Sequence, residues 1–582
     1  MSFIHCYRYH LFLVLALFLS GIACRKQNST QNSGQVHYDP AQDPLVNPPA
    51  LFESPPADPC LISRQETLYL TLRTNPGTLN PLFVSSVSAF IVVDVLFKNL
   101  VLVDQNMDWQ INKEMVRSFE ESADHTIFIV RLKPHLKWQD GSSLRAQDVV
   151  FSWQQIKDPQ VPAWGQKRSI NPITECVALD DFTIKYVQPK PDAMRRWNLL
   201  FPIIPKHIFE KDKAKYPDLK SGAWYEQQRR NPIGNGPYKI LEWKDKERII
   251  LERWEDYYGR KPYIQRLVFR IIPDEKTALY YLEQGKVDLI DQLSTRRFAL
   301  ETNTPAFQKV AGKVWSVQPI FRYIGWNMDG SNPFFQDCRV RRALTCALNI
   351  PLILEKVYYN LAAPCGGIYH PDSWMYNPNV KKLEYDLEKS AALLDKAGWK
   401  VDPQHGWRSK QIEGRNVTFE FSLLAPLNPP YVSQIAAIFQ EDLKKLGINM
   451  KIRQLEWSAF LEMIRGHQFQ AMLNIWSPGP DPDLDRSVWH SAGYALGRNY
   501  IGYSNPQIDG LYEKGRFEFD FQARRRIYQE IHKILYEDQP YTWIVHEPDL
   551  AVINKRIRGV QQGPQGIFRF YPGIERWWIP HS

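Results

Sequence analysis

Segments with the pattern of β-strands alternate with segments with the pattern of α-helices along most of this 582-residue chain. In the C-terminal half, apolar runs at 416–424, 448–455 and 470–476 are separated by amphipathic runs at 431–447 and 457–466. This alternation predicts an α/β fold whose lobes have largely parallel sheets. A chain of this length exceeds what one hydrophobic core supports, so we expect two or three lobes. The sequence shows no repeat of about 20–50 residues, which excludes a solenoid.

The N-terminal half mixes the same elements with hairpins. Residues 66–74 alternate as a strand does, and a helix is predicted to begin near Ala146. Another helix is predicted to start after Asp274 and to stop at Gly285. Residues 337–359 form a long helical pattern with one apolar face.

The N-terminus has the pattern of an export signal. Arg8 precedes an apolar run at 11–23, which is too short to span a bilayer. Cys24 follows small residues at the end of this run, as in the lipobox of bacterial lipoproteins, where the thiol is lipidated after cleavage. We predict a signal peptide at 1–23 and a lipid anchor on Cys24, which places the protein in the periplasm or on the cell surface. Secretion with an incidental cysteine is the alternative.

Residues 24–65 follow this signal and contain much Gln, Asn, Ser and Pro with few apolar groups. Such a composition does not repay the entropy of ordering the chain. We predict a flexible linker that holds the folded part away from a membrane. No other segment is long and apolar enough to cross a membrane.

The mature chain beyond Cys24 keeps an odd number of cysteines, at Cys60, Cys176, Cys338, Cys346 and Cys365. Cys338 and Cys346 lie eight residues apart on a predicted helix, about 12 Å along its axis, which is too far for a disulfide. A Cys338–Cys365 pair is compatible with an oxidising compartment. Buried free thiols are the alternative, and the spacings do not suggest a zinc site.

A loop at 474–485, "NIWSPGPDPDLD", gathers Asp481, Asp483 and Asp485 directly after a predicted strand. Because ligands of open α/β sheets gather at the carboxyl ends of strands, we predict that this loop forms the lip of a ligand pocket. A calcium loop is excluded, because Arg486 and Ala492 stand where Gly and Glu are needed. A structural role remains the alternative, with the acids forming turns or capping the next helix.

The composition and motifs favour binding over catalysis. The net charge of +9 is small for this length, and the basic residues are scattered among acids, so we do not expect a nucleic-acid partner. The sequence has no nucleophile elbow, HExxH motif or phosphate loop, and its 13 His residues show no ligand spacing. We predict no catalytic residue, no metal and no cofactor. A secreted hydrolase that uses Asp481 and a distant carboxylate is the rival hypothesis.

Several stretches in a fixed order resemble the family 5 extracellular solute-binding proteins, the oligopeptide- and dipeptide-binding receptors of bacterial ABC importers. The resemblance extends from about residue 66 to the end of the chain. Each matching stretch alone is weak evidence for the family, but the complete set in this order is highly specific for it. The stretches include "TLNPL" (78–82), "LKWQDGSSLRAQDVVFSW" (136–153), "GNGPYKI" (234–240), "WEDYYGRKPYI" (254–264), "NPFFQDCRVRRALTCALN" (332–349) and "NYIGYSNPQIDGL" (499–511).

The resemblance implies a type II periplasmic-binding-protein fold, in which two lobes close about a hinge and an additional domain is attached. Lobe I would consist of 66–98, 226–317 and 549–582. The additional domain II would be 99–225, and lobe III would be 318–548. In such receptors an extended peptide lies between the lobes, main-chain hydrogen bonds supply affinity, and hydrated pockets accept varied side chains.

The resemblance also implies site residues. Family members often place an Asp three residues after the Trp of the loop to hold the peptide's N-terminal ammonium. Here Gly479 stands at that position, so Asp481 or Asp483 would serve. Trp476 and Trp457 match family aromatics near the ligand, with core packing as the alternative.

The stretch at 83–90 matches the edge that pairs with the peptide backbone in the family, through Ser85 and Val87. The expected function is therefore that of a monomeric substrate-binding lipoprotein that delivers di- or oligopeptides to the permease of an ABC importer. An oligosaccharide or a nickel chelate is the alternative ligand. An acidic loop favours a ligand with a cationic end, which a peptide has.

Overall fold

The computed structural model describes residues 38–163, 166–167, 170–215, 229–568 and 570–581. The predicted signal peptide at 1–23 and Cys24 lie outside these residues. Within the described ranges, no helix combines the length and the apolar character needed to cross a membrane.

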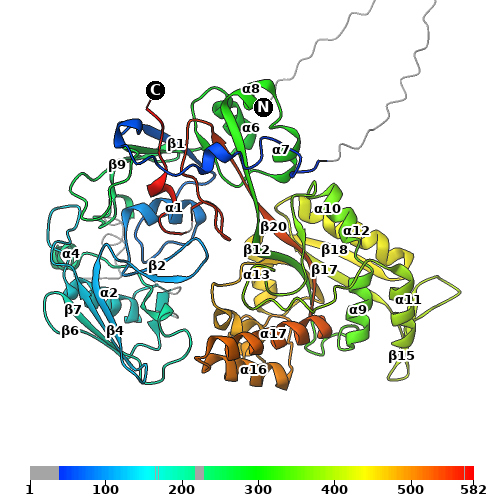
Figure 1. Cartoon of the computed structure of the whole chain (residues 1–582). Helices are drawn as coiled ribbons and strands as arrows, with labels where there is room; N and C mark the ends of the chain where they lie inside the picture. Colours follow the sequence, from blue (N-terminus) through cyan, green and yellow to red (C-terminus); the bar gives the residue numbers. More distant parts are fainter. Residues whose placement is uncertain (1–37, 164–165, 168–169, 216–228, 569, 582) are drawn as a thin grey trace, which may run out of the picture. The chain divides into compact units, whose positions relative to one another are not determined.

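The described chain is organised around one large mixed sheet (Figure 1). Its strand order is β18-β17-β19-β12-β20-β11-β1-β10-β9-β8, with β13 added beside β20. Parallel pairing joins β18 to β17, β17 to β19, β11 to β1 and β1 to β10, and the other pairs are antiparallel. The sheet is therefore less parallel than the alternation of elements predicted, because hairpins and long antiparallel strands complete it.

Two long strands connect the two ends of this sheet. β12 (Ala311–Trp326) and β20 (Tyr541–Asn554) run antiparallel side by side, as Figure 1 shows. Their register shifts between Val317 and Phe321, where the pairing passes from Pro548 to His546. On one side β12 continues to β19, and on the other β20 continues to β11. Main-chain pairing is interrupted at this point and resumes beyond it, so the same two strands join the two ends of the sheet.

The C-terminal half follows the predicted alternation closely. Strands β17 (Glu420–Pro426), β18 (Asn449–Leu455) and β19 (Ala471–Trp476) form the parallel part, and helices α12 (Tyr431–Lys445) and α13 (Trp457–Arg465) pack on them. The other elements of this half are β13 (Ala363–Pro364), α9 (Cys338–Cys346), α10 (Ile350–Lys356), α11 (Leu387–Lys396), β14 (Lys400–Val401), β15 (Arg408–Ile412), β16 (Arg415–Thr418), η4 (Pro482–Asp485), α14 (Arg486–Trp489), α15 (Gly493–Leu496), α16 (Pro506–Arg516) and α17 (Phe521–Asp538).

The other end of the sheet combines short parallel strands with a hairpin. Its strands are β1 (Thr67–Leu72), β11 (Leu289–Ile290), β10 (Arg266–Ile271), β9 (Arg248–Arg253) and β8 (Tyr238–Lys244), and its helices are α1 (Val87–Leu96), α6 (Glu275–Glu283), α7 (Thr295–Leu300), α8 (Pro305–Val310) and η5 (Gly573–Arg576). Helix α6 begins after Asp274, whose carboxylate accepts from the backbone N–H of Thr277. That cap is the one the sequence predicted.

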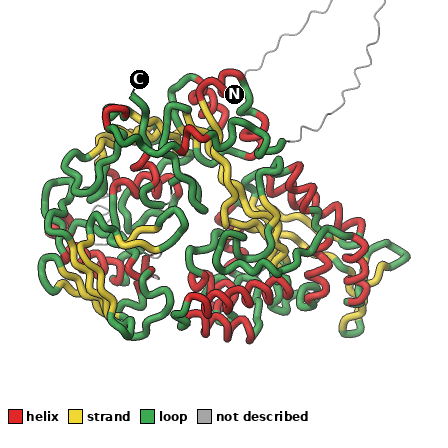
Figure 2. The backbone as a smooth tube through the Cα atoms, in the orientation of Figure 1, coloured by secondary structure: helices red, strands yellow, loops and turns green. Residues whose placement is uncertain are grey.

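A separate small sheet lies between β1 and β8 in the chain. It has the antiparallel order β4-β5-β7-β6, and helix α2 packs against β6 and β7 (Figure 2). Its elements, with the short pair β2-β3, are β2 (Val101–Val103), β3 (Trp109–Ile111), β4 (Val116–Glu121), β5 (Ile127–Leu132), α2 (Ala146–Lys157), β6 (Glu175–Ala178), β7 (Thr183–Val187), η3 (Trp197–Leu199) and α4 (Lys206–Lys215). The predicted helix start near Ala146 is confirmed.

The flexible linker predicted for residues 24–65 is wrong from Tyr38 onward, because there the chain packs on the body of the protein, and residues 24–37 lie outside the described ranges. This segment contains η1 (Pro49–Phe52) and η2 (Pro59–Leu61), and it buries Tyr38, Leu51 and Ile62. Asp43 pairs with the fully buried ammonium of Lys313 at 2.6 Å. A few well-placed apolar side chains and one ion pair therefore order a stretch whose composition alone predicted flexibility.

The long helix predicted at 337–359 is two helices. Helix α9 ends at Cys346, and α10 starts at Ile350 with Asn349 as its cap and Pro351 in its first turn. Pro351 cannot supply an N–H to an uninterrupted helix, so it fits only where a helix begins. The described cysteines are free thiols: Cys176, Cys346 and Cys365 are buried, and Cys60 and Cys338 are exposed.

Candidate functional site

The acidic loop follows the carboxyl end of β19, as predicted, and its carboxylates have partners within the protein. Arg524 of helix α17 donates two hydrogen bonds of 2.7 Å to Asp481 and one of 2.9 Å to Asp483. The hydroxyl of Tyr528 donates to Asp483 at 2.5 Å. Asp481 also accepts from the backbone N–H of Asp483, which caps η4.

Asp485, the third acid of the loop, is buried beneath it. It accepts from the indole N–H of Trp476 at 3.3 Å and from the backbone N–H of Gly479 at 3.1 Å. Burial raises the pKa of Asp485 to about 6, and the nearby guanidinium of Arg498 opposes that rise. Burial, with repulsion from Asp481, also raises the pKa of Asp483 to about 6. The three carboxylates therefore fix the shape of the loop.

Gly479 is the residue that the loop geometry requires. A Cβ at this position would lie 2.6 Å from the Cδ1 atom of Leu484. No side chain fits there without displacing Leu484, and this includes the Asp that the family resemblance led us to expect. The glycine at position 479 therefore allows Leu484 to pack against the loop backbone.

The two predicted tryptophans differ in their surroundings. Trp476 is half-buried, and the guanidinium of Arg498 lies 4.8 Å from its ring centroid. Trp457 is 50% exposed at the start of α13 and stacks on Phe460. Trp457 therefore offers a ring face to solvent, whereas Trp476 has one partner on its ring and another at its indole N–H.

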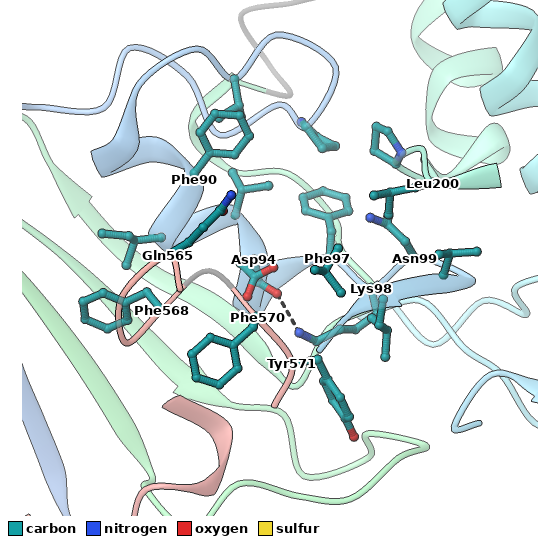
Figure 3. A pocket seen from close by; sticks show the side chains of 18 of the residues that line it. Phe90, Asp94, Phe97, Lys98, Asn99, Leu200, Gln565, Phe568, Phe570 and Tyr571 are labelled. Atoms are coloured by element: carbon teal, nitrogen blue, oxygen red, sulfur yellow. Dashed lines mark hydrogen bonds between the residues drawn. The ribbon is translucent and has the colours of Figure 1, made fainter. Parts of the chain in front are cut away.

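The stretch at 83–90 lies at a cavity of about 510 Å³ (Figure 3). Ser85 and Val87 both line it, and Ser86 begins helix α1 by accepting from the N–H of Ala89. Two smaller cavities, of about 320 and 50 Å³, also include Val87 and Ile91. The first turns of α1 thus adjoin all three cavities, in which the described lining includes no residue of the acidic loop.

Sequence reasoning missed several residues of this cavity. Aromatic rings of Phe90, Phe97 and Phe568 line it, together with the charged residues Asp94 and Lys98. Asp94 is the one acid in the apolar run that forms α1. A lone carboxylate in such a helix was the signal that could have indicated this site, because an apolar helix accommodates a charge only where it is paired or reaches water.

The comparisons with known proteins identify the family. Residues 110–495, more than half of the chain, match the family described as bacterial extracellular solute-binding proteins, family 5 middle. The chain belongs to this family of extracytoplasmic receptors, and the predicted type II periplasmic-binding-protein fold is confirmed.

Two relatives and one solved structure show the range of the family. The chain is 28% identical over 522 residues to the oligopeptide-binding protein AppA of Bacillus subtilis, which covers 87% of this chain and 90% of that protein. It is 25% identical over 481 residues to heme-binding protein A of Haemophilus influenzae, with coverages of 79% and 83%. The structure of AppA from Bacillus subtilis in complex with a nonapeptide superposes with a TM-score of 0.71 at 26% identity, covering 89% of this chain and 99% of that one.

Proposed function

We propose that this protein is the substrate-binding lipoprotein of an ABC importer, and that it captures peptides and delivers them to a membrane permease. The observation that carries the peptide assignment is the cavity at the start of α1, which Ser85 and Val87 line. The resemblance to the family implies that the stretch at 83–90 pairs with a peptide backbone. The structure of one relative, AppA, contains a bound nonapeptide. Extended peptides gain affinity from main-chain hydrogen bonds with little dependence on sequence.

The proposed lobes correspond to separate sets of buried side chains. One apolar cluster lies within 321–545, inside the proposed lobe III. A second lies within 82–209 and belongs almost wholly to the proposed domain II. A third joins 51–97, 238–314 and 551–579. These clusters support the division into lobe I, domain II and lobe III, with the β12–β20 pair as the connection that would bend on closure.

The proposed roles of the site residues follow from their contacts. Ser85 and Val87 would meet the peptide backbone, and exposed Trp457 would cover a ligand side chain. Trp476 would lie beside the ligand with its indole N–H engaged by Asp485. For Asp481 and Asp483 the contacts with Arg524 favour a structural role, so we propose that they hold the loop in place.

Native mass spectrometry of the gently purified protein tests the ligand class. Receptors that close over a ligand release it slowly, so ligand from the host is expected to remain bound. A ladder of adducts that fragments into amino-acid series would support the peptide assignment and give the peptide length. A single adduct without such fragments would overturn it.

The alternative ligand is a non-peptide solute. Heme-binding protein A is a relative at 25% identity, and Gly479 stands where an ammonium anchor is common in peptide receptors. A protein that retains one defined chelate or oligosaccharide, and that fails to bind a mixed peptide library, would establish this alternative.

The anchor and the absence of chemistry are proposals that need their own tests. Cys24→Ser is expected to release the protein from membranes into the soluble fraction, and continued retention would contradict the lipoprotein assignment. Peptides incubated with the protein are expected to be recovered intact. Cleaved products would favour the rival hydrolase hypothesis.

A further inference from the structure

Helix α1 presents one face to the large cavity. Val87, Phe90, Ile91 and Asp94 line the cavity and follow the spacing of three to four residues that places side chains on one side of a helix. Lys98 lines it just beyond the end of the helix. Rings from the C-terminal segment, those of Phe568, Phe570 and Tyr571, line it as well. Figure 3 shows Asp94 among Phe97, Phe570 and Lys98. The cavity is thus apolar and aromatic, with a few charged groups on the α1 side.

Among the residues that the structure describes, the carboxylate of Asp94 makes no close polar contact, and Lys98 acts on it only as a nearby charge that opposes the rise in its pKa. Within the described ranges, no residue gives it a hydrogen bond or an ion pair. Its side chain is exposed to solvent, yet enough protein surrounds it that burial raises its pKa. A carboxylate on the wall of a cavity combines contact with solvent and a pKa raised by the surrounding protein. A carboxylate in this position is only partly hydrated, which leaves it available to a cation.

Lys98, whose charge acts on Asp94, makes its close contacts with other groups. Its ammonium lies 2.5 Å from Glu575, which is buried, and it donates to the backbone carbonyl of Asp94 at 2.8 Å. Glu114, whose charge also acts on Lys98, accepts from the hydroxyls of Tyr257 and Tyr571 and from the backbone N–H of Arg260. With Lys98 and Glu575 compensating each other, Asp94 leaves one excess negative charge at the cavity.

The rings around Asp94 suit the same kind of ligand. Phe90 is 51% exposed although it is large and apolar, and Phe568 and Phe570 line the cavity near it. Aromatic faces attract ammonium groups, more strongly where water is partly excluded. A neutral apolar ligand would pack on the rings and leave the Asp94 carboxylate poorly solvated. A cationic ligand would contact the rings and also pair with this carboxylate.

We propose that this cavity binds an ammonium group of the captured solute, with Asp94 as its counter-ion and the neighbouring aromatic rings covering its hydrocarbon part. This inference rests on the proposed function, because it names the chemistry of the ligand held at the same site. In a peptide the ammonium comes from a lysine side chain or from the N-terminus. The geometry assigns to Asp94 in helix α1 the cation-binding role that the sequence led us to expect of Asp481 or Asp483.

The first experiment uses small probes, so that it does not depend on peptide binding. Phenethylammonium and its neutral isostere 2-phenylethanol are titrated into the purified protein by ligand-observed NMR at pH 8. Burial raises the pKa of Glu575 to about 7, so at pH 8 the Lys98–Glu575 pair is ionised and its charges cancel. We expect phenethylammonium to bind about tenfold more tightly than the alcohol.

Matched variants assign this preference to Asp94. Asp94→Asn keeps the size of the side chain and is expected to abolish the preference for the cation. Asp256→Asn, at an exposed acid that does not line the cavity, is expected to keep it. Equal binding of the two probes, no binding of either probe, or an unchanged preference in a folded Asp94→Asn protein would each overturn the inference. The melting temperature of each variant establishes that it is folded.

A peptide arm distinguishes the source of the ammonium. A bound lysine-containing peptide is compared with its lysine→norleucine analogue and with its N-acetylated form. Loss of affinity on the first change assigns the lysine side chain, and loss on the second assigns the N-terminus. A peptide that tolerates both changes overturns the inference. If no peptide binds while phenethylammonium still binds through Asp94, the peptide assignment fails and the cation site stands.

Discussion

Arg524 and Asp481 form a bidentate ion pair, with Nη1 donating to Oδ2 and Nη2 donating to Oδ1, each at 2.7 Å. Both side chains are buried, and the same guanidinium also reaches Asp483 at 2.9 Å. The pair ties the loop after β19 to helix α17. Parallel N–H···O bonds between planar groups fix orientation as well as distance, so this contact determines where the loop lies.

Arg524→Met is expected to destabilise the protein by about 3–5 kcal/mol, because it leaves two buried carboxylates without a cation. The measurement is the melting temperature, compared with that of Arg525→Met. Arg525 is the exposed neighbour on the same helix, and its variant should melt as the wild type does. Equal melting temperatures for the two variants would show that the pair contributes little.

The cost of Arg524→Met should also shrink as the pH falls. Without the guanidinium, the folded-state pKa of Asp483, already raised to about 6 by burial, rises further. The folded variant then binds protons that the unfolded chain does not, so its stability increases relative to the wild type as pH decreases. Melting curves between pH 7 and pH 5 test this. A gap that stays constant across the range would contradict it.

Gly479→Ala should destabilise the loop by about 1–3 kcal/mol, because the added Cβ would lie 2.6 Å from Leu484. Leu484→Ala removes the closest contact, that with Cδ1, and leaves the Cβ of residue 484 at 2.9 Å. Because part of the clash is relieved, the double variant should lose less stability than the two single effects add up to. Gly77→Ala is the control, because a Cβ at Gly77 meets nothing within 4 Å. Additive effects of Gly479→Ala and Leu484→Ala would show that they do not clash.

The regular elements could be predicted from the sequence, whereas the contacts that surround the candidate site could not. Strands β17, β18 and β19 with helices α12 and α13 were found from apolar periodicity alone, because each element buries one continuous face. The loop acids were located correctly, but their partner Arg524 comes from a helix about 40 residues later, and local spacing carries no information on such a contact. Asp94 was missed because its significance depends on the cavity that α1 forms with a segment more than 470 residues away.

The packed segment from Tyr38 onward also depends on a contact with a residue far away in the sequence. Its order depends on Lys313, which is fully buried and binds Asp43, Asn303 and the face of the Tyr38 ring. The composition of a segment gives the number of its apolar groups, but it does not reveal that a distant strand supplies a cation for Asp43.

Lys313→Met is therefore expected to loosen the residues from Tyr38 to Leu51. The substitution leaves Asp43 buried without its cation, which costs about 3–5 kcal/mol locally. Hydrogen exchange of this segment should accelerate, while the exchange of β17 and β19 stays unchanged. Lys309→Met, at an exposed lysine of helix α8, is the matched control. Protection of the segment in Lys313→Met equal to that in the control would contradict the assigned role of the ion pair.

His532 should make the protein less stable in mild acid. It is buried, its Nδ1 accepts from the N–H of Asn377 at 3.0 Å, and its Nε2 therefore donates to the carbonyl of Gly366 at 2.9 Å. Burial lowers the pKa of His532 from 6.5 to about 4. Between these values the unfolded chain binds a proton that the folded protein does not, so stability falls as pH decreases, by about 1.4 kcal/mol per pH unit.

His532→Gln isolates this contribution, because the other titrating groups are common to both proteins. The variant is expected to melt below the wild type at pH 7, and the gap should narrow as the pH falls from 6.5 towards 4, since only the wild type has the imidazole that protonates on unfolding. His135→Gln, at an exposed histidine, should follow the wild-type curve throughout. A gap that widened on acidification would mean that the folded protein, not the unfolded chain, takes up the proton, and that His532 is charged where it is buried.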